Sequence, residues 1–364
     1  MTWWILLFIF IQIHFNELEA NVVTIKDIAE RAQLSIGTVD RVIHGRGRVS
    51  KKTEQKIKEI IKKTGYKTNI HARNLSLKKT HRFGVIMPLP EQDGGYWEIL
   101  KNGIDQATSE LSSFNVHRHF YFFDKYSESS FIAAGKKALS EKMGGLLIAP
   151  VLLNAGTSFV QSIPESVPYV YVDSTIPGTT PIAAIGQNSY QSGVCAARLM
   201  NMLLAGRGEI AVLRMLPNDF HINERVRGFL AYFERNRAVA AQVFNVEGSA
   251  NEQELIGLIK SIEHELPSCR GFFITNAETY RIAKALQLDG RNRYRVIGYD
   301  CTKENMHLLE QGAVDFIISQ NTREQGYAGI NSLFRRIVLK EPVATGEVTM
   351  PIDIVIAENL SYYR

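Results

Sequence analysis

The feature that most constrains this chain is a short basic segment near its N-terminus, in which apolar residues recur at helical spacing. Between Asn21 and Thr80 there are 15 Lys and Arg residues against 5 Asp and Glu, whereas the whole chain carries a formal charge of only +5. A basic segment ahead of a mildly acidic body is typical of a nucleic-acid-binding module, because Lys and Arg neutralise phosphates. A solvated Lys-rich helix face would give the same composition, so charge alone leaves both interpretations open.

Three short helices are predicted in this segment. Thr24, followed three residues later by Asp27, is a capping-box pattern that predicts a first helix over 25–32. A third helix is expected to start after Ser50 and to end at Gly65, because serine caps helix starts and glycine ends helices.

The second of these helices has one apolar and one polar face. Ser35 can cap it, and Val39, Val42 and Ile43 then fall on one side at helical spacing. That apolar side would pack on the first helix. The polar side would then be free to enter a major groove, where Arg41 could pair with a guanine.

The runs T-I-K-D-I-A-E-R-A, S-I-G-T-V and G-Y-K-T-N resemble the headpiece of the LacI/GalR family of bacterial transcription regulators. The resemblance implies a helix-turn-helix DNA-binding domain over 22–68. Asp40 departs from the family pattern, which usually has Ser or Ala there, so we do not count it as a DNA contact. The DNA contacts that the resemblance implies in the helical segment are Thr24, Ser35, Ile36, Gly37, Thr38, Arg41 and His44.

Residues 69–80 are expected to form a hinge helix or linker. Asn69, Ala72 and Leu75 match an N-x-x-A-x-x-L pattern that, in the family, folds on operator DNA and wedges a leucine into the minor groove. Such a wedge works in pairs, which implies a homodimer on near-palindromic double-stranded operator DNA. An ordinary linker is the alternative.

From residue 81 onward, buried strands alternate with helical stretches, which predicts an α/β body. Its length favours two doubly wound parallel-sheet lobes, approximately 81–206 with 321–345 and 207–320 with 346–364. The resemblance of the headpiece further implies a periplasmic-binding-protein-like body, so the expected fold is an all-α headpiece plus such a body. The strand candidates are Phe83–Met87, Leu146–Ala149, Tyr169–Val172, Ile210–Leu213, Phe272–Thr275, Val296–Tyr299 and Phe316–Ser319.

The body resembles the ribose-binding subgroup of the periplasmic-binding-protein fold, and this resemblance implies a ligand site between the lobes. The implied set contains two aromatic residues that would stack on a sugar ring, an arginine in E-R-V-R-G-F, three polar residues at strand ends and one in a cleft-lining turn. Core aromatics and loop caps are the structural alternatives. The implied ligand-binding residues are Tyr96, Trp97, Arg225, Asn276, Asp300, Gln320 and Asn188.

Residues 1–21 include the apolar run W-W-I-L-L-F-I-F-I, with no Lys or Arg before it. The run is too short for a hydrocarbon layer of about 30 Å. We interpret it as a hydrophobic extension from a misassigned upstream start, with synthesis beginning near Val22; a membrane anchor is the alternative. Cys195, Cys269 and Cys301 are far apart and form no C-x-x-C pair, which fits a reducing cytoplasm.

No P-loop, dinucleotide fingerprint or nucleophile elbow is present, so we expect neither an enzyme nor a cofactor or metal requirement. His117 and His119 alternate as on a half-exposed strand rather than as metal ligands. The sequence thus predicts a cytoplasmic, homodimeric transcription regulator that is controlled by a small polar effector such as a sugar. We favour a repressor over an activator. A secreted or anchored solute-binding receptor is the alternative. Effector identity, operator sequence, sign of control and tetramer formation stay open.

Overall fold

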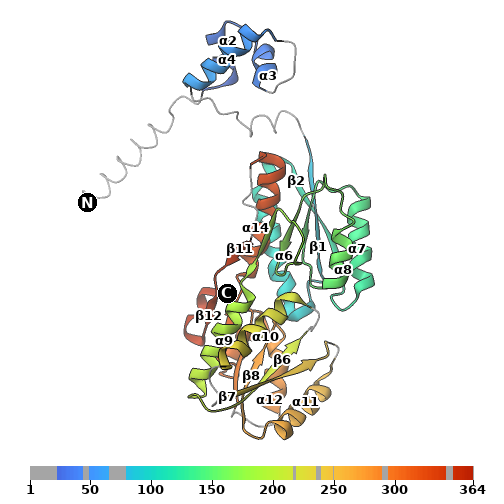
Figure 1. Ribbon diagram of the computed structural model, residues 1–364, viewed down its shortest axis with the longest axis vertical. Coiled ribbons are helices and arrows are strands. Elements are labelled where there is room, and N and C mark those ends of the chain that lie inside the picture. The colour runs from blue at the N-terminus through green and yellow to red at the C-terminus, as the bar shows by residue number, and fades with distance from the viewer. Residues whose placement is uncertain are drawn as a thin grey trace, which may run out of the picture. The chain divides into compact units, whose positions relative to one another are not determined.

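The computed structural model describes residues 23–43, 49–64, 79–215, 219–234, 239–248, 250–288, 294–341 and 347–363. These residues belong to two compact units, Met1–Lys79 and Thr80–Arg364, here called the headpiece and the body (Figure 1). The predicted N-terminal extension, His44, and the hinge residues Asn69, Ala72 and Leu75 lie outside the described residues.

The headpiece has the three predicted helices: α2 (Ile25–Ala32), α3 (Ile36–Ile43) and α4 (Lys51–Thr64). The capping box at Thr24 is present, because the Thr24 amide donates to Asp27 Oδ2 at 2.7 Å and the Asp27 amide donates to Thr24 Oγ1 at 3.3 Å. The Ser35 and Ser50 hydroxyls each accept a backbone amide three residues on, at 3.2 Å. The capping signals therefore set the helix starts where the sequence predicts them.

A small apolar core holds these helices together. It consists of the buried side chains Ile28, Ala29, Ala32, Val39 and Ile57, with Val42 and Ile43 packed at its edge. The predicted inward face of α3 is confirmed.

The body contains two six-stranded sheets with the same strand order. The first sheet runs β11-β5-β4-β3-β1-β2 and the second runs β12-β10-β9-β8-β6-β7. Neighbouring strands are parallel except β10 and β12, which are antiparallel. The strands are β1 (His81–Pro88), β2 (Val116–Phe123), β3 (Gly145–Ile148), β4 (Tyr169–Val172), β5 (Ala183–Gln187), β6 (Gly208–Met215), β7 (Val239–Val246), β8 (Cys269–Ile274), β9 (Arg295–Tyr299), β10 (Phe316–Ser319), β11 (Glu347–Met350) and β12 (Asp353–Val355).

Helices cover both faces of each sheet, as Figure 1 shows, and the expected two-lobed fold is confirmed. The first lobe has one continuous core, and the second has two cores on opposite faces of its sheet. The helices of the first lobe are α6 (Tyr96–Glu110), α7 (Glu128–Ser140), α8 (Leu153–Val160) and α14 (Thr322–Phe334). Those of the second lobe are α9 (Ser189–Leu203), α10 (Phe220–Phe233), α11 (Glu252–Glu265), α12 (Thr279–Leu288) and α13 (Lys303–Glu310). The short helical turns are η1 (Gln92–Gly95), η2 (Ser112–Phe114), η3 (Arg335–Leu339) and η4 (Ala357–Tyr363).

The chain passes between the lobes three times: after β5, after β10 and after β11. Helix α9 packs on α10, so it belongs to the second lobe, although the sequence assigned 189–203 to the first. Strand β11 pairs with β5, so 347–350 belong to the first lobe rather than the second. The observed lobe boundaries differ from the predicted ones because the spacing of apolar residues predicts a helix or a strand but not the lobe to which it belongs.

Each lobe contains a pair of helices that cross at glycines. A Cβ at Gly193 would overlap the carbonyl oxygen of Arg225, and one at Gly228 would overlap that of Tyr190. The α6 and α14 pair has the same arrangement in the first lobe. The absence of side chains at the α9–α10 crossing brings the backbone of α9 against the turn of α10 that carries Arg225.

No helix in the described part of the chain has the length and apolarity needed to cross a membrane.

Candidate functional site

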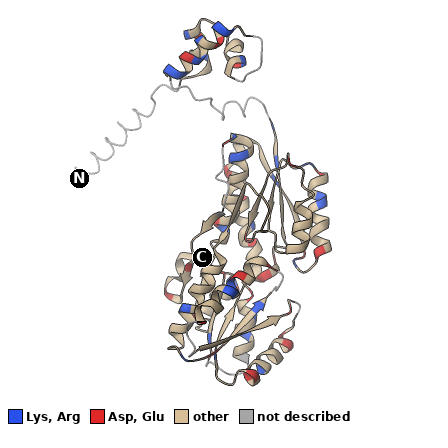
Figure 2. Ribbon diagram, viewed as in Figure 1, with Lys and Arg blue, Asp and Glu red and all other residues tan. Residues whose placement is uncertain are grey.

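The outer face of α3 is the candidate DNA-reading surface. Ser35, Gly37 and Arg41 are exposed, and 49% of the Ile36 surface is accessible, which is unusual for an isoleucine. Thr38 is half-buried, and its hydroxyl lies 2.9 Å from that of Ser35. Figure 2 shows Lys and Arg along the neighbouring α4. The predicted α3 contacts therefore lie on one accessible face, with Thr24 at the start of the adjacent helix.

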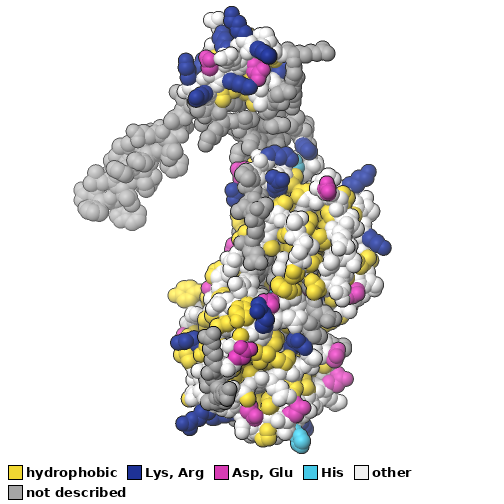
Figure 3. All heavy atoms as spheres, in the orientation of Figure 1, with side chains coloured by type: hydrophobic (Ala, Val, Ile, Leu, Met, Phe, Trp, Pro, Cys, Tyr) yellow, Lys and Arg dark blue, Asp and Glu magenta, His cyan; other side chains and the backbone are white. Residues whose placement is uncertain are grey.

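Exposed basic residues also lie on the neighbouring helix α4. Lys51, Lys52, Lys62 and Lys63 on α4 are exposed, and Figure 3 shows dark blue side chains over the surface of the headpiece. Such a distribution suits contact with phosphates on both sides of a groove.

Six of the seven predicted ligand residues line one cavity of about 20 Å³ between the lobes. They come from the start of α6, from α10, and from the ends of β8, β9 and β10. The carboxyl ends of parallel strands are where ligands bind in open α/β sheets. The six are Tyr96, Trp97, Arg225, Asn276, Asp300 and Gln320.

Arg225 is the central cation of this cavity and is 1% exposed. Its guanidinium donates to the carbonyl oxygen of Thr275 at 2.7 Å and to Gln320 Oε1 at 2.5 Å, and it lies 3.9 Å from the ring centroid of Tyr299. The Nε–H has no hydrogen-bond partner among the described residues. Three residues of the second lobe thus hold Arg225 in place, and its Nε–H can still donate a hydrogen bond.

Asp300 lies beside Gln320, whose amide nitrogen donates to both carboxylate oxygens at 3.0 Å. Burial raises the pKa of Asp300 to about 7, although Arg225 and Gln320 act in the opposite direction. Its backbone has a φ of 68°, a left-handed conformation that is costly for a residue other than glycine. Asp173, at the end of β4 in the first lobe, has the same conformation, with a φ of 70°.

The aromatic wall of the cavity is formed by Tyr96 and Trp97, both almost fully buried. Their rings pack edge to face at 4.9 Å. The Tyr96 hydroxyl donates to Asp173 Oδ1 at 2.5 Å, and Trp97 Nε1 donates to Asp93 Oδ2 at 2.7 Å. Burial and Asp173 raise the pKa of Tyr96, so this hydroxyl keeps its proton. Both aromatic residues also belong to the core of the first lobe.

A second acidic group faces the same cavity from the start of α10. Asp219 caps this helix, with Oδ1 accepting from the His221 amide at 3.1 Å and from Ser174 Oγ at 3.2 Å. His221 Nδ1 lies 2.7 Å from Asp219 Oδ1 and 3.8 Å from Asp173 Oδ2. Ser174 belongs to the first lobe and Asp219 to the second, so this group links them.

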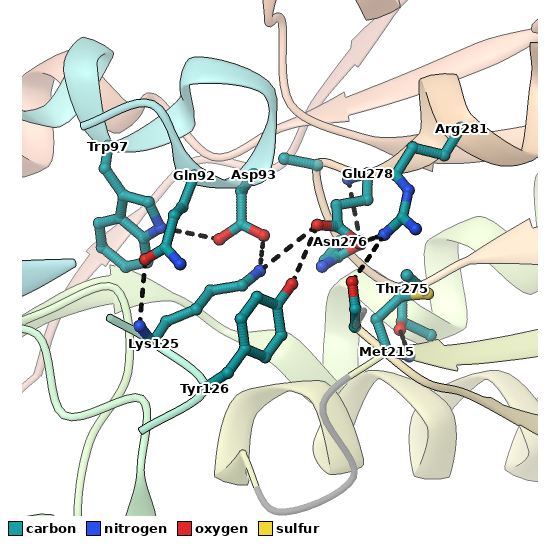
Figure 4. Close-up of polar contacts among 12 residues, drawn as sticks. Gln92, Asp93, Trp97, Lys125, Tyr126, Met215, Thr275, Asn276, Glu278 and Arg281 are labelled. Atoms are coloured by element: carbon teal, nitrogen blue, oxygen red, sulfur yellow. Dashed lines mark hydrogen bonds and ion pairs between the residues drawn. The ribbon is translucent and has the colours of Figure 1, made fainter. Parts of the chain in front are cut away.

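A cluster of charged residues, here called the rim cluster, lies where the two lobes meet beside the cavity (Figure 4). Lys125 extends from the end of β2, pairs with Asp93 in its own lobe and lies 3.7 Å from Glu278 Oε1 of the other lobe. The Tyr126 hydroxyl donates to Glu278 Oε1 at 3.1 Å, and Arg281 Nη1 lies 2.8 Å from Glu278 Oε2. Burial lowers the pKa of Lys125 to about 8. These contacts hold the lobes together at the cavity edge.

Asn188 is the predicted ligand residue that does not line the central cavity. It caps α9 by accepting the Gln191 amide at 2.9 Å, and it lines a neighbouring cavity of about 370 Å³ that shares Asp173 and His221 with the central one. The structural alternative of a helix cap therefore describes what Asn188 does in this structure.

Five further residues were not predicted from the sequence: Asp173, Asp219, His221 and Asp93, which line the cavity, and Lys125 at its edge. A signal for Asp173 was available, because V-Y-V-D follows the same pattern as V-I-G-Y-D at the equivalent strand of the other lobe. Lys125 and Asp93 carry no such signal, since they meet only through the packing of β2 against η1.

Comparison with known proteins agrees with this architecture. Residues 83–341 match the family model of the periplasmic binding protein domain, and residues 24–69 match that of bacterial regulatory proteins of the lacI family. The chain therefore belongs to the periplasmic-binding-protein-domain family, with a lacI-family DNA-binding domain at its N-terminus.

Individual proteins are similar to this chain over part or most of its length. The chain is 39% identical over 96 residues to catabolite control protein A from Streptococcus mutans, a match that covers 26% of this chain and 28% of the relative. A candidate LacI transcriptional regulator from Bacteroides fragilis has a crystal structure that covers 79% of this chain and all of its own, with a TM-score of 0.73 and 29% identity. A sugar-binding protein of a sugar ABC transporter from Bacillus halodurans has a TM-score of 0.66 at 24% identity, covering 78% of this chain and all of its own.

Proposed function

We propose that this protein is a transcription regulator that binds a near-palindromic operator as a homodimer and responds to a small polar effector, most simply a sugar or sugar derivative. The observation that carries the proposal is the combination, in one chain, of an accessible helix-turn-helix face and a polar cavity between two lobes. We also propose that the protein works in the cytoplasm, where operator DNA is accessible to it.

Several features support the DNA-binding part. The apolar face of α3 packs into the headpiece core. The opposite face, which carries Arg41 and its exposed neighbours, is therefore the one that can enter a groove. A single such module makes few base contacts, and pairing two of them on a twofold-symmetric site gives the affinity and spacing expected of a specific operator complex. We propose that the residues matching the family hinge, Asn69, Ala72 and Leu75, add minor-groove contacts.

The effector part rests on the cavity. Its lining comes from both lobes, so a ligand that contacts Tyr96 from one side and Arg225 from the other changes the free energy of lobe closure. An aromatic wall with a few fixed polar groups is typical of a site for small polar ligands. If closure changes operator affinity, the effector must bind the DNA-bound and DNA-free forms with different affinities.

The experiment that tests the proposal is selection of genomic DNA fragments by the purified full-length protein. We expect enrichment of one short near-palindrome, and a loss of affinity in Arg41→Ala of roughly 5- to 150-fold, the range for one bidentate base contact. Arg335→Ala removes the same charge from an exposed site in the body and should leave affinity unchanged. Failure of both proteins to enrich any sequence would refute the regulator assignment.

A second measurement tests the effector site. Genes beside the recovered operators supply candidate metabolites, and the metabolite that changes operator affinity is then tested on Arg225→Ala. We expect the response to be lost while operator binding persists. A full response in Arg225→Ala would move the effector site away from this cavity.

A further inference from the structure

Acidic side chains outnumber basic ones in the central cavity. Asp173, Asp219 and Asp300 line it, and the basic groups beside them are Arg225 and His221. The nearby cations of the rim cluster are already matched, because Lys125 pairs with Asp93 and Arg281 pairs with Glu278. With all three carboxylates ionised, the lining keeps a surplus of negative charge whether His221 is charged or neutral.

One of these carboxylates has an oxygen that the protein does not use. Asp219 is 1% exposed, and its Oδ1 takes all of the contacts from Ser174 and His221. Its Oδ2 has no hydrogen-bond partner among the described residues. A buried carboxylate oxygen without a donor is unfavourable, and such an atom in a ligand cavity marks where a donor of the ligand belongs.

The other two carboxylates are held in place at a conformational cost. Asp173 and Asp300 end equivalent strands of the two lobes, and each has a left-handed backbone. Strain of this kind is kept where the surrounding structure fixes a residue for a role. Their hydrogen-bond donors, Tyr96 and Gln320, are neutral and do not neutralise charge, and His221 Nδ1 lies 3.8 Å from Asp173 Oδ2.

We propose that the effector carries a positively charged amino group that binds Asp219 Oδ2 and balances the carboxylates of the cavity. This inference rests on the proposed function and specifies its ligand: a hydroxylated primary amine such as an amino sugar, which the cavity of about 20 Å³ can admit only after the lobes open. The hydroxyl groups of such a ligand match the amides of Asn276 and Gln320, and its ammonium matches the acidic side. The Asp219–Ser174 bond joins the two lobes, so a cation at Asp219 also stabilises the interface that closes over it.

A neutral sugar would fit this cavity less well for an electrostatic reason. Its hydroxyls could donate to Asp219 Oδ2, but the surplus negative charge would then be enclosed without a counter-charge. Burial already raises the pKa of Asp300 to about 7, although Arg225 acts in the opposite direction. An ammonium would lower that pKa again, so binding of an amine near pH 7 should release a proton from the protein.

The test compares matched pairs of probes on the full-length protein by isothermal titration calorimetry. The pairs are D-glucose with D-glucosamine, D-galactose with D-galactosamine, and D-mannose with D-mannosamine, with the N-acetyl derivatives as neutral controls. We expect at least one amine to bind roughly tenfold or more tightly than its neutral partner, since bonds to charged groups are the stronger ones. Asp219→Asn should remove that preference, whereas Asp105→Asn, at a surface ion pair of α6, should keep it.

The outcomes separate the proposal from the function on which it rests. If the neutral sugars bind as tightly as the amines, if Asp219→Asn keeps the preference, or if no amine binds, the proposal is overturned while operator selection still supports the regulator. Asp219 also caps α10, so the variant is checked for an unchanged thermal transition. Should it unfold, Ser174→Ala, which leaves the cap intact, must weaken amine binding more than sugar binding.

Discussion

Replacing Asp300 with asparagine should stabilise the protein at neutral pH and lose this advantage in acid. Asp300 is buried beside Arg225 and Gln320, and burial raises its pKa from an ordinary 3.8 to about 7. Below pH 3.8 the carboxyl is protonated in both the folded and the unfolded chain. Between the two pKa values the folded chain retains a proton that the unfolded chain has lost, so stability falls as the pH rises through this window.

The magnitude follows from the width of that window. A shift of about three pKa units corresponds to about 4 kcal/mol of penalty above pH 7. Asparagine cannot ionise and avoids this penalty, but its amide nitrogen would face the Gln320 amide, at a cost of about 1 kcal/mol. About two pH units of the range between the unfolded and folded pKa values lie between pH 5 and pH 8. The increase in the free energy of unfolding of Asp300→Asn over wild type should therefore be roughly 3 kcal/mol larger at pH 8 than at pH 5.

Urea unfolding of the full-length chain at the two pH values measures this difference. Trp97, the only tryptophan after residue 4, lies in the same cavity and provides the fluorescence signal. Asp105→Asn is the control, because its exposed ion pairs should change stability equally at both pH values. A difference between Asp300→Asn and wild type that is the same at pH 5 and pH 8 would refute the reasoning.

Three further substitutions test other parts of the structure. Gly228→Ala should lower the stability of the body by about 1–3 kcal/mol in urea, because its Cβ would overlap the Tyr190 carbonyl, whereas Gly257→Ala on α11, with open space around it, should be neutral or stabilising. Glu278→Gln should cost about 3 kcal/mol, because it leaves Lys125 and Arg281 facing a neutral amide; a cost no larger than that of the exposed Glu128→Gln would contradict a role for the rim cluster. Ser50→Ala should reduce the hydrogen-exchange protection of the first turn of α4 by about 1 kcal/mol; equal protection in Ser50→Ala and the exposed Ser109→Ala would argue against the cap.

Much of the fold is readable from the sequence because burial and capping are local signals. All seven predicted strands are present as β1, β3, β4, β6, β8, β9 and β10. The other five strands were not predicted: β5 consists mainly of small residues, and the remaining four are partly exposed or short. In β2 and β7 several side chains are exposed or half-buried, and β11 and β12 are short strands at sheet edges.

The candidate site was predictable where a residue ends a buried strand or follows a family motif. Asp300, Gln320 and Asn276 follow strands that the periodicity identifies, and Arg225 follows the family motif. Asp219 could not be found in this way, because a helix cap and a ligand contact look identical in sequence. Lys125 was hidden for a different reason: its partners Asp93 and Glu278 come from two lobes, and only the tertiary structure brings them together.

The three passages between the lobes meet at one side chain. The Gln187 amide nitrogen, at the start of the first passage, donates to the carbonyl oxygen of Ser319 at the start of the second at 2.9 Å and to that of Pro351 in the third at 2.8 Å. Any movement that pulled the lobes straight apart would break both bonds, whereas a rotation with Gln187 near its axis keeps them. We therefore expect the lobes to open and close by such a rotation, in which a ligand between them would change the angle between the lobes rather than their separation.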